Sequence, residues 1–164
     1  KRQALGTSSS AATIPVTLKS TLNNKVDENV AGFVIPLCAT IHLSGSMMKI
    51  GLYAFAVIYM AGMDIPWGLS LGFILLLGIM MIAAPGVPGG AIMAATGLLA
   101  SMLGFNDDMV ALMIAAYIVI DSFGTAANVT GDGAIALVVN RFAAGKMEGV
   151  SENKEEQELI DESA

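Results

Sequence analysis

Charged residues are scarce in this sequence: they make up 13% of its 164 residues, against about 25% in soluble globular domains. Hydrophobic residues make up 55%, and the mean hydropathy is +0.70. Cys38 is the only cysteine, which excludes an internal disulfide and a cysteine-based metal site. No basic patch is present, which excludes nucleic acid as a partner. This composition excludes a soluble enzyme and a disordered chain, and it predicts a membrane protein.

The few charges gather at the C-terminal end. Residues 148–164 hold seven acidic residues and one lysine, which equals the whole net charge of −6. Such a segment predicts a flexible, solvated tail. The first ten residues lack the pattern of a signal peptide, and the sequence does not begin with Met. We therefore expect the chain to be the C-terminal part of a longer protein.

The longest uncharged stretch exceeds one membrane crossing. Residues 65–106 carry no charged side chain, and one helix of that length would measure about 63 Å, roughly twice the ~30 Å hydrocarbon core. Residues 85–90 contain two prolines and three glycines, which do not continue a helix. The arms 65–84 and 91–105 therefore predict a re-entrant hairpin.

Basic residues on both sides of the apolar region indicate its orientation. They are Lys19, Lys25, Arg141 and Lys146. Because cytoplasmic loops are enriched in Lys and Arg, both ends of the region are expected inside the cell. One crossing outward, a hairpin that dips in from outside and one crossing back satisfy this condition. The predicted fold is an all-α polytopic membrane protein with re-entrant hairpins and broken transmembrane helices.

Polar side chains within the apolar segments are the candidate site residues, because such groups are costly at membrane depth. Asp121, Asn128 and Asp132 fall within about 40° of one another on a helix at 100° per residue. Two carboxylates and an amide on one stripe suit a cation or an ammonium group. The alternative is a helix that has already left the membrane, with these side chains in water.

A second polar group interrupts the apolar run over residues 29–63. It comprises Thr40, His42, Ser44, Gly45, Ser46 and Lys49. Gly45 between two serines predicts an unwound turn, which at membrane depth lines a cavity and builds the sites of secondary transporters. A plain polar turn, or a histidine hydrogen-bonded within a bundle, is the alternative. An intramembrane hydrolase that uses Ser44 and His42 is disfavoured, because no third group orients them.

Together and in this order, these segments resemble the C-terminal part of the glutamate transporter, or dicarboxylate/amino acid:cation symporter, family. Residues 7–15 resemble the serine-rich tip of its first re-entrant hairpin, and residues 40–46 stand at its unwound turn. Residues 86–89 match the tip of the second hairpin, the extracellular gate. The string Asn-Val-Thr-Gly-Asp at 128–132 matches the last, ligand-binding helix. The resemblance covers roughly residues 5–145.

The resemblance implies the residues of a transport site. Those expected at the substrate are Ser9, Ser10, Val87, Gly89, Asp121, Thr125 and Asn128. Those expected at sodium are Thr40, Asn128 and Asp132. In the family, the counterpart of Asp121 holds the amino group of the substrate, and the counterpart of Val87 lies over the substrate as a gate.

The resemblance also divides the chain. The expected transport-domain segments within 1–147 are a hairpin tip (7–15), a broken helix (29–63), a second re-entrant hairpin (65–105) and a last helix (108–145). Residues 148–164 form the cytoplasmic tail. The trimer scaffold of the family precedes these segments, so a homotrimer would assemble through parts outside this sequence.

This sequence departs from the family pattern at the site. Gly124 stands where transporters of acidic amino acids carry an arginine, so a side-chain carboxylate would lose its bidentate partner. A neutral amino acid is therefore favoured over glutamate. His42 and Ser44 replace an asparagine and an aspartate of the turn, and Lys49 follows. We expect these three to affect coupling, with Lys49 or protonated His42 in place of a bound cation. The alternative is that Lys49 snorkels to water.

The function that the resemblance implies is that of a cation-coupled secondary symporter of the cell membrane rather than an enzyme. It would carry a small amino acid or dicarboxylate with sodium, or in part with protons, and would need no other cofactor. Its partners would be the substrate and the bilayer. The competing class is a non-transporting or channel-like structural subunit, against which the glycines of the tip at 85–90 indicate a gated site.

Overall fold

The computed structural model describes residues 6–64 and 66–162, with side chains up to Ala143. All regular structure in these residues is helical, as expected. The elements are η1 (Ala11–Thr13), α2 (Ile14–Asn23), α3 (Glu28–Ile41), α4 (Ser44–Met60), α5 (Trp67–Ala83), α6 (Gly90–Leu103), α7 (Asp107–Val119) and α8 (Asp121–Glu162).

Helix boundaries follow local chemistry. The Asp27 side chain accepts hydrogen bonds from two backbone N–H groups of the first turn of α3, at 2.8 and 3.4 Å. Asn106 caps α7 in the same way, at 2.9 Å. Gly89 and Gly104, with φ of 72° and 68°, flank α6 in the left-handed region, which glycine adopts without steric cost. The segment 84–89 thus separates α5 from α6, which are the two arms of a helical hairpin.

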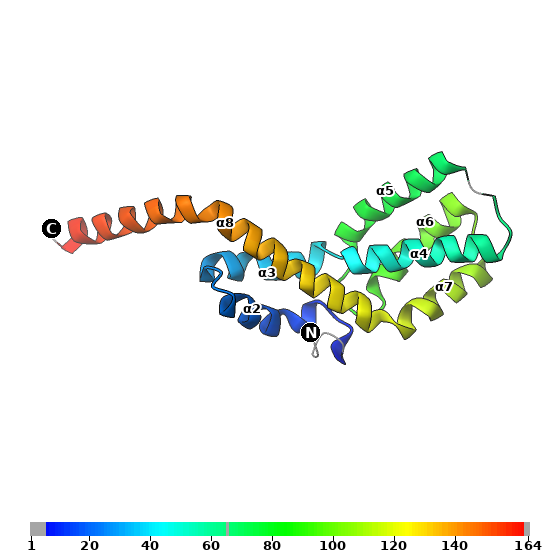
Figure 1. The fold of residues 1–164 in the computed structure, drawn as a ribbon, viewed down its shortest axis with the longest axis horizontal. Coiled ribbons are helices and arrows are strands. Elements are labelled where there is room, and N and C mark those ends of the chain that lie inside the picture. Colours follow the sequence, from blue (N-terminus) through cyan, green and yellow to red (C-terminus); the bar gives the residue numbers. More distant parts are fainter. Residues whose placement is uncertain (1–5, 65, 163–164) are drawn as a thin grey trace.

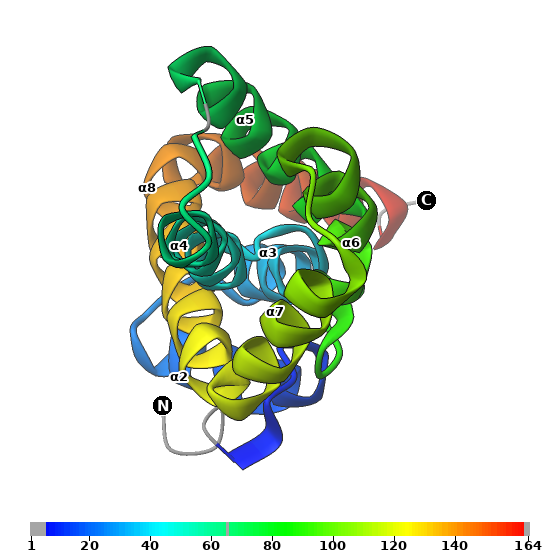
Figure 2. The ribbon, with the colours of Figure 1, turned by 90° about the vertical axis from the view of Figure 1, so that its right-hand side faces the viewer.

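The helices form two packed groups joined by α8. The apolar core of one group comes from α4, α5, α6 and α7, and that of the other from α2, α3 and α8. In Figure 1, α8 runs past α2 and α3 and reaches α7, while α3 and α4 follow one another. Figure 2 views the first group from its end. The site described below lies where these groups meet, at the interrupted ends of several helices.

Two apolar helices are broken rather than continuous. The segment Glu28–Met60 is long and apolar enough to cross a membrane, and it is interrupted at residues 42–43 between α3 and α4. The helices Asp107–Val119 and Asp121–Ala143 meet the same criteria only as a pair, bent by 65°. The single last helix predicted over 108–145 is therefore wrong. The break at Ile120 leaves its carbonyl within 3.5 Å of the Lys49 ammonium.

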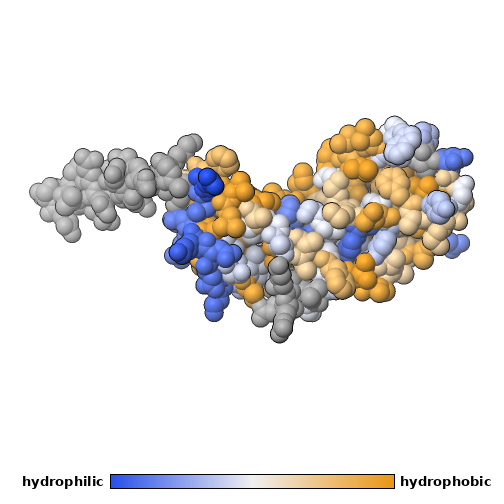
Figure 3. Space-filling view, viewed as in Figure 1, coloured by the Kyte–Doolittle hydropathy of each residue, from blue (hydrophilic) through white to orange (hydrophobic). Residues whose placement is uncertain are grey.

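The outer surface carries many large apolar side chains. Five of them are 69–91% exposed: Phe33, Tyr59, Trp67, Val119 and Phe142. Figure 3 shows apolar surface over much of the face in view. Exposed apolar area of this extent marks a surface that contacts lipid or other protein.

The C-terminal acidic segment continues α8 as far as Glu162. Figure 1 shows this part of the helix extending away from the other helices. The acidity of residues 148–164 predicted a flexible tail instead. The segment is rich in Glu, with Gln, Lys and Leu, and these are strong helix formers that favour the helical backbone seen here.

The contact between α4 and α8 depends on glycine, which gives a first testable prediction. A Cβ at Gly45 would lie 2.6 Å from the Gly124 carbonyl oxygen and 2.7 Å from the Ala127 Cβ. We expect Gly45→Ala to destabilise the full-length protein by about 1–3 kcal/mol, as overpacking does. Thermal and chemical unfolding in detergent measures this effect.

The matched control lies on the same helix. A Cβ at Gly51 would meet nothing within 4 Å, so Gly51→Ala should be neutral or stabilise by up to about 1 kcal/mol through helix propensity. Equal stability of the two variants would contradict the close packing of α4 on α8.

Candidate functional site

Two irregular segments from distant parts of the sequence meet in the structure. The first tip is residues 8–10, before η1, and the second tip is residues 84–89, between α5 and α6. The Ser9 hydroxyl donates a hydrogen bond to the Gly86 carbonyl at 2.9 Å, and the Ala11 amide donates to the same oxygen at 3.2 Å. A Cβ at Gly86 would lie 2.5 Å from the Ala39 carbonyl oxygen of α3. The close approach of three backbone segments therefore requires glycine here.

A small cavity lies beneath these tips. Its lining residues are Ser8, Ser10, Leu43, Ser46, Pro85, Gly86, Val87, Ala91, Tyr117, Asp121, Thr125 and Asn128. Five of the seven predicted substrate residues are among them. The other two, Ser9 and Gly89, lie beside the cavity and bond to Gly86 and Asp121. Val87 lines the cavity and is also 51% exposed, so it lies at the rim of the cavity.

Asp121 begins α8 directly after the bend, and the residue is 5% exposed. One oxygen, Oδ1, accepts a hydrogen bond from the Lys49 ammonium at 2.9 Å. The other, Oδ2, accepts from the Gly89 backbone N–H at 2.9 Å. Asp121 therefore joins α4 and the second tip to the start of α8, and both of its oxygens have partners within the chain.

Lys49 is buried, with 9% of its surface exposed. Its ammonium also lies 3.6 Å from the centroid of the Tyr117 ring, a cation–π contact. A Cβ at Gly124 would lie 2.5 Å from the Lys49 Cε. The lysine side chain thus fills the space that any side chain at position 124 would enter. The alternative that Lys49 snorkels to water is wrong, because its charge is paired inside the protein.

Asn128 connects α8 to the start of α4. Its side-chain oxygen accepts hydrogen bonds from the Gly45 amide at 2.7 Å and the Ser46 amide at 3.4 Å. Its Nδ2 donates to the Ser46 hydroxyl at 3.2 Å, which also accepts from the Tyr117 hydroxyl at 2.9 Å. No side chain at the N-cap of α4 makes this bond. Asn128, from a different helix, therefore provides the hydrogen-bond acceptor for the first backbone amides of α4.

Asp132 lies one turn further along α8 and is 1% exposed. The Nδ1 atom of His42 lies 2.8 Å from its Oδ1. Asp121, Asn128 and Asp132 are thus all buried on one side of α8, as the helical spacing predicted. Each of the two carboxylates faces a basic side chain from the region of the α3–α4 break.

The other residues of the predicted turn lie differently. Thr40 is exposed, and its hydroxyl donates to the Leu37 carbonyl of its own helix at 2.8 Å. Ser44 is exposed at the start of α4. In the part of the chain that the structure describes, no three His, Cys, Asp or Glu side chains converge as metal ligands do. Thr40, Asn128 and Asp132 as sodium ligands stay a prediction.

Tyr117 is a site residue that the sequence reasoning missed. It is 2% exposed, contacts the Lys49 ammonium and donates to Ser46. Its only signal in the sequence was a polar aromatic residue in an apolar run, four positions before Asp121. The break at Ile120 removes the regular helical spacing between these positions, so periodicity did not link them.

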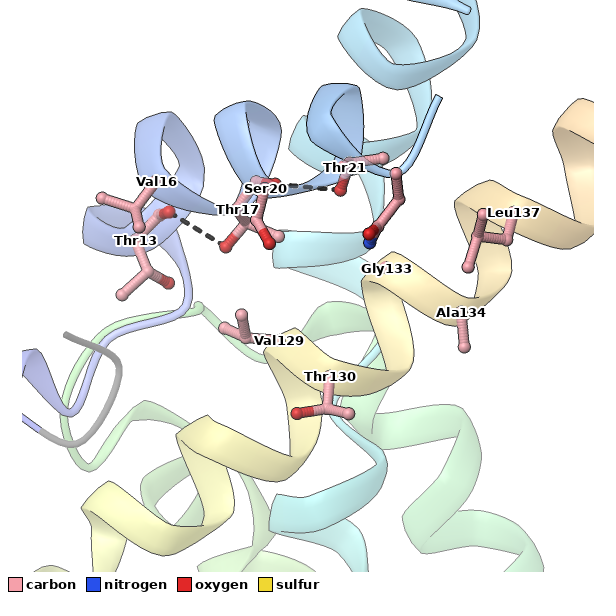
Figure 4. A pocket seen from close by; sticks show the side chains of 11 residues that line it. Thr13, Val16, Thr17, Ser20, Thr21, Val129, Thr130, Gly133, Ala134 and Leu137 are labelled. Carbon is pink, nitrogen blue, oxygen red and sulfur yellow. Dashed lines mark hydrogen bonds between the residues drawn. The ribbon is translucent and has the colours of Figure 1, made fainter. Parts of the chain in front are cut away.

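A second cavity lies between α2 and α8 (Figure 4), and none of the predicted site residues lines it. It is lined largely by threonine, serine and small residues. The hydroxyls of Thr17 and Thr21 donate to carbonyls of their own helix, at 3.0 and 2.9 Å. These two hydroxyls are therefore already paired within the chain.

Broken helices whose interrupted ends and buried polar groups enclose a small cavity are the way in which secondary transporters build their binding sites. The comparison with known families agrees with this class. The model of the sodium:dicarboxylate symporter family matches residues 2–142. The chain belongs to this family, which is a family of transporters and not of enzymes.

Several excitatory amino acid transporters are similar to the chain. Excitatory amino acid transporter 1 of Ambystoma tigrinum is 34% identical over 146 residues, which cover 88% of this chain and 27% of that protein. Excitatory amino acid transporter 5 of Homo sapiens is 33% identical over 130 residues, covering 79% and 23%. The putative sodium-dependent excitatory amino acid transporter glt-4 of Caenorhabditis elegans is 32% identical over 150 residues, covering 88% and 29%. The chain thus spans about a quarter of the length of these relatives.

Proposed function

We propose that the full-length protein is a cation-coupled secondary symporter for a small amino acid or dicarboxylate, and that it spans the cell membrane several times. The observation that carries this proposal is the convergence of both tips and of Asp121 and Asn128 on one cavity. In the described residues, the hydrogen bonds between the tips all end on the Gly86 carbonyl, so separation of the tips would widen the cavity. A small cavity beneath two tips supports a gated site rather than an open channel.

The two arms of the second hairpin, α5 and α6, would carry the outer gate. The tip at residues 84–89 lies between them and donates the Gly89 amide to Asp121. We infer that loss of this bond and of the Gly86 contacts frees the tip and admits the substrate. The second opening, toward the cytoplasm, would follow with the site still closed to the outside.

Sodium is the proposed coupling ion, with protons as a second candidate. The family description and one relative's name refer to sodium, which supports the first. The His42–Asp132 pair supports the second, because a basic side chain here faces the carboxylate expected at sodium. A homotrimer, formed through segments outside this sequence, is part of the same proposal and rests on the family resemblance alone.

Among amino acids, we propose that a neutral one is favoured over glutamate. This preference rests on Gly124, which offers no side-chain cation to a second carboxylate. The ammonium of Lys49 lies close by, but it is already bonded to Asp121. A side-chain carboxylate would therefore gain no unpaired cation at this place.

Ligand-dependent thermal stabilisation of the purified full-length protein tests the proposal. Amino acids and dicarboxylates are screened in sodium, in potassium and at two pH values. A transported solute at about a hundred times its Kd should stabilise the folded protein by about 2.7 kcal/mol. A shift that requires sodium supports sodium coupling. An equal shift in potassium contradicts it, and no shift with any acid contradicts the proposed function.

A further inference from the structure

The charge of Asp121 is already balanced within the chain. We propose that Lys49 is a built-in counter-ion which takes the role of a substrate ammonium, so that the site selects small carboxylic acids that lack an amino group. This inference rests on the proposed function, since it names the solute class of the same site. The observation behind it is the buried ion pair of Lys49 with Asp121, at 2.9 Å.

A solute ammonium would have to displace Lys49 or share its partner. The side chains of Lys49 and Asp121 are 11% and 7% exposed, so neither charge is compensated by bulk water. An incoming ammonium offers Asp121 the same charge and the same donor type that Lys49 already supplies. The exchange would gain no new interaction, and it would leave the lysine charge buried without a carboxylate, which is strongly unfavourable.

Other contacts hold Lys49 in this position. Its ammonium lies on the Tyr117 ring and within 3.5 Å of the Ile120 carbonyl, and its stem lies against Gly124. Tyr117 is itself fixed by its hydrogen bond to Ser46. The cation is therefore one part of a packed cluster in which α4, α7 and α8 each contribute a group.

The cavity keeps features that suit the carboxylate end of a solute. Ser8 and Ser10 of the first tip line it, and Ala91 places the first turn of α6 at its wall. Hydroxyl groups and a helix N-terminus both favour an anion. With Asp121 neutralised by Lys49, no unpaired negative charge opposes this binding. The carboxylate of the solute is then the group that the site recognises. An amino group of the solute would find no unpaired carboxylate of the protein to bind.

Matched pairs of acids provide the experiment. Succinate and L-aspartate differ by one amino group, and so do propionate and L-alanine. Their affinities are measured by isothermal titration calorimetry with the purified full-length protein in sodium. We expect the wild-type protein to bind the amine-free member of a pair about tenfold more tightly or better, as the loss of a charged hydrogen bond implies.

Lys49→Met removes the charge and keeps the length of the side chain. It leaves Asp121 free to bind an ammonium, so the preference within each pair should shift toward the amino acid by about tenfold or more. Lys19→Met is the matched control, because Lys19 is exposed on α2 and should leave both affinities unchanged.

Gly124→Ala is a second variant that retains the lysine. Its Cβ would collide with the Lys49 stem and displace the ammonium from Asp121. We expect a shift in the same direction as with Lys49→Met, and smaller. This variant keeps the test decisive if Lys49→Met fails to fold.

Two results would overturn the inference alone. One is a wild-type protein that binds the amino acid of a pair as tightly as its amine-free partner, or more tightly. The other is an unchanged preference in a folded variant whose lysine is removed or displaced. In both cases the protein still binds small acids, so the proposed function stands. Failure of the wild-type protein to bind any of the four acids would overturn the inference and the proposed function together.

Discussion

Replacing Asp121 with alanine is expected to lower the free energy of unfolding of the full-length protein by about 3–5 kcal/mol. The reason is that Lys49 would stay buried with its charge unpaired, since its ammonium has no other carboxylate partner among the ion pairs of the described residues. The Gly89 amide would also lose its acceptor. Chemical unfolding in detergent measures the loss.

A double variant separates the ion pair from other effects of the substitution. Asp121→Ala combined with Lys49→Met removes both charges, and a buried pair replaced as a unit is often close to neutral. We therefore expect the double variant to be more stable than Asp121→Ala alone. Asp64→Ala, at an exposed position before α5, should change stability by no more than about 0.5 kcal/mol. Full stability of Asp121→Ala would show that the pair with Lys49 does not form.

Local sequence signals predicted the helical framework well. The prolines and glycines at 85–90 end α5 and precede α6, because they lack either a backbone donor or a side chain that favours the helix. Gly45 between two serines predicted an unwound turn, and the helix breaks close by, at residues 42–43 between α3 and α4, with Gly45 in the first turn of α4. The common face of Asp121, Asn128 and Asp132 followed from helix geometry alone. Each of these signals acts over one or two helical turns.

Contacts between distant segments were beyond this reasoning. Lys49 and Asp121 are 72 positions apart, and the Ser9 hydroxyl bonds to a carbonyl 77 positions away. Their distances depend on how whole helices pack, which no local pattern encodes. The break at Ile120 has no proline or glycine to signal it. It occurs in an apolar run, next to the buried Lys49–Asp121 pair that the irregular backbone accommodates.

Asn128→Ala is expected to destabilise the protein by about 1–3 kcal/mol, the cost of leaving buried donors unpaired. The substitution removes the acceptor of the Gly45 and Ser46 amides at the start of α4, where no N-cap side chain can replace it. It also removes one of the two donors to the Ser46 hydroxyl, the other being the Tyr117 hydroxyl. The ligand-dependent rise in melting temperature should therefore shrink together with the stability, because the turn that lines the cavity loses its support.

Asn128→Asp separates the loss of the acceptor for the α4 amides from the loss of the donor to Ser46. A carboxylate keeps the acceptor for the α4 amides and interacts favourably with a helix N-terminus, but it loses the donor to Ser46. We expect this variant to unfold at a higher denaturant concentration than Asn128→Ala. Thr130→Ala, an exposed position on α8 whose hydroxyl bonds only to its own helix, should stay within about 0.5 kcal/mol of wild type. If the aspartate variant is instead the less stable one, the Ser46 bond and the burial of a new charge outweigh the capping of α4, and the turn is held mainly by its side-chain network.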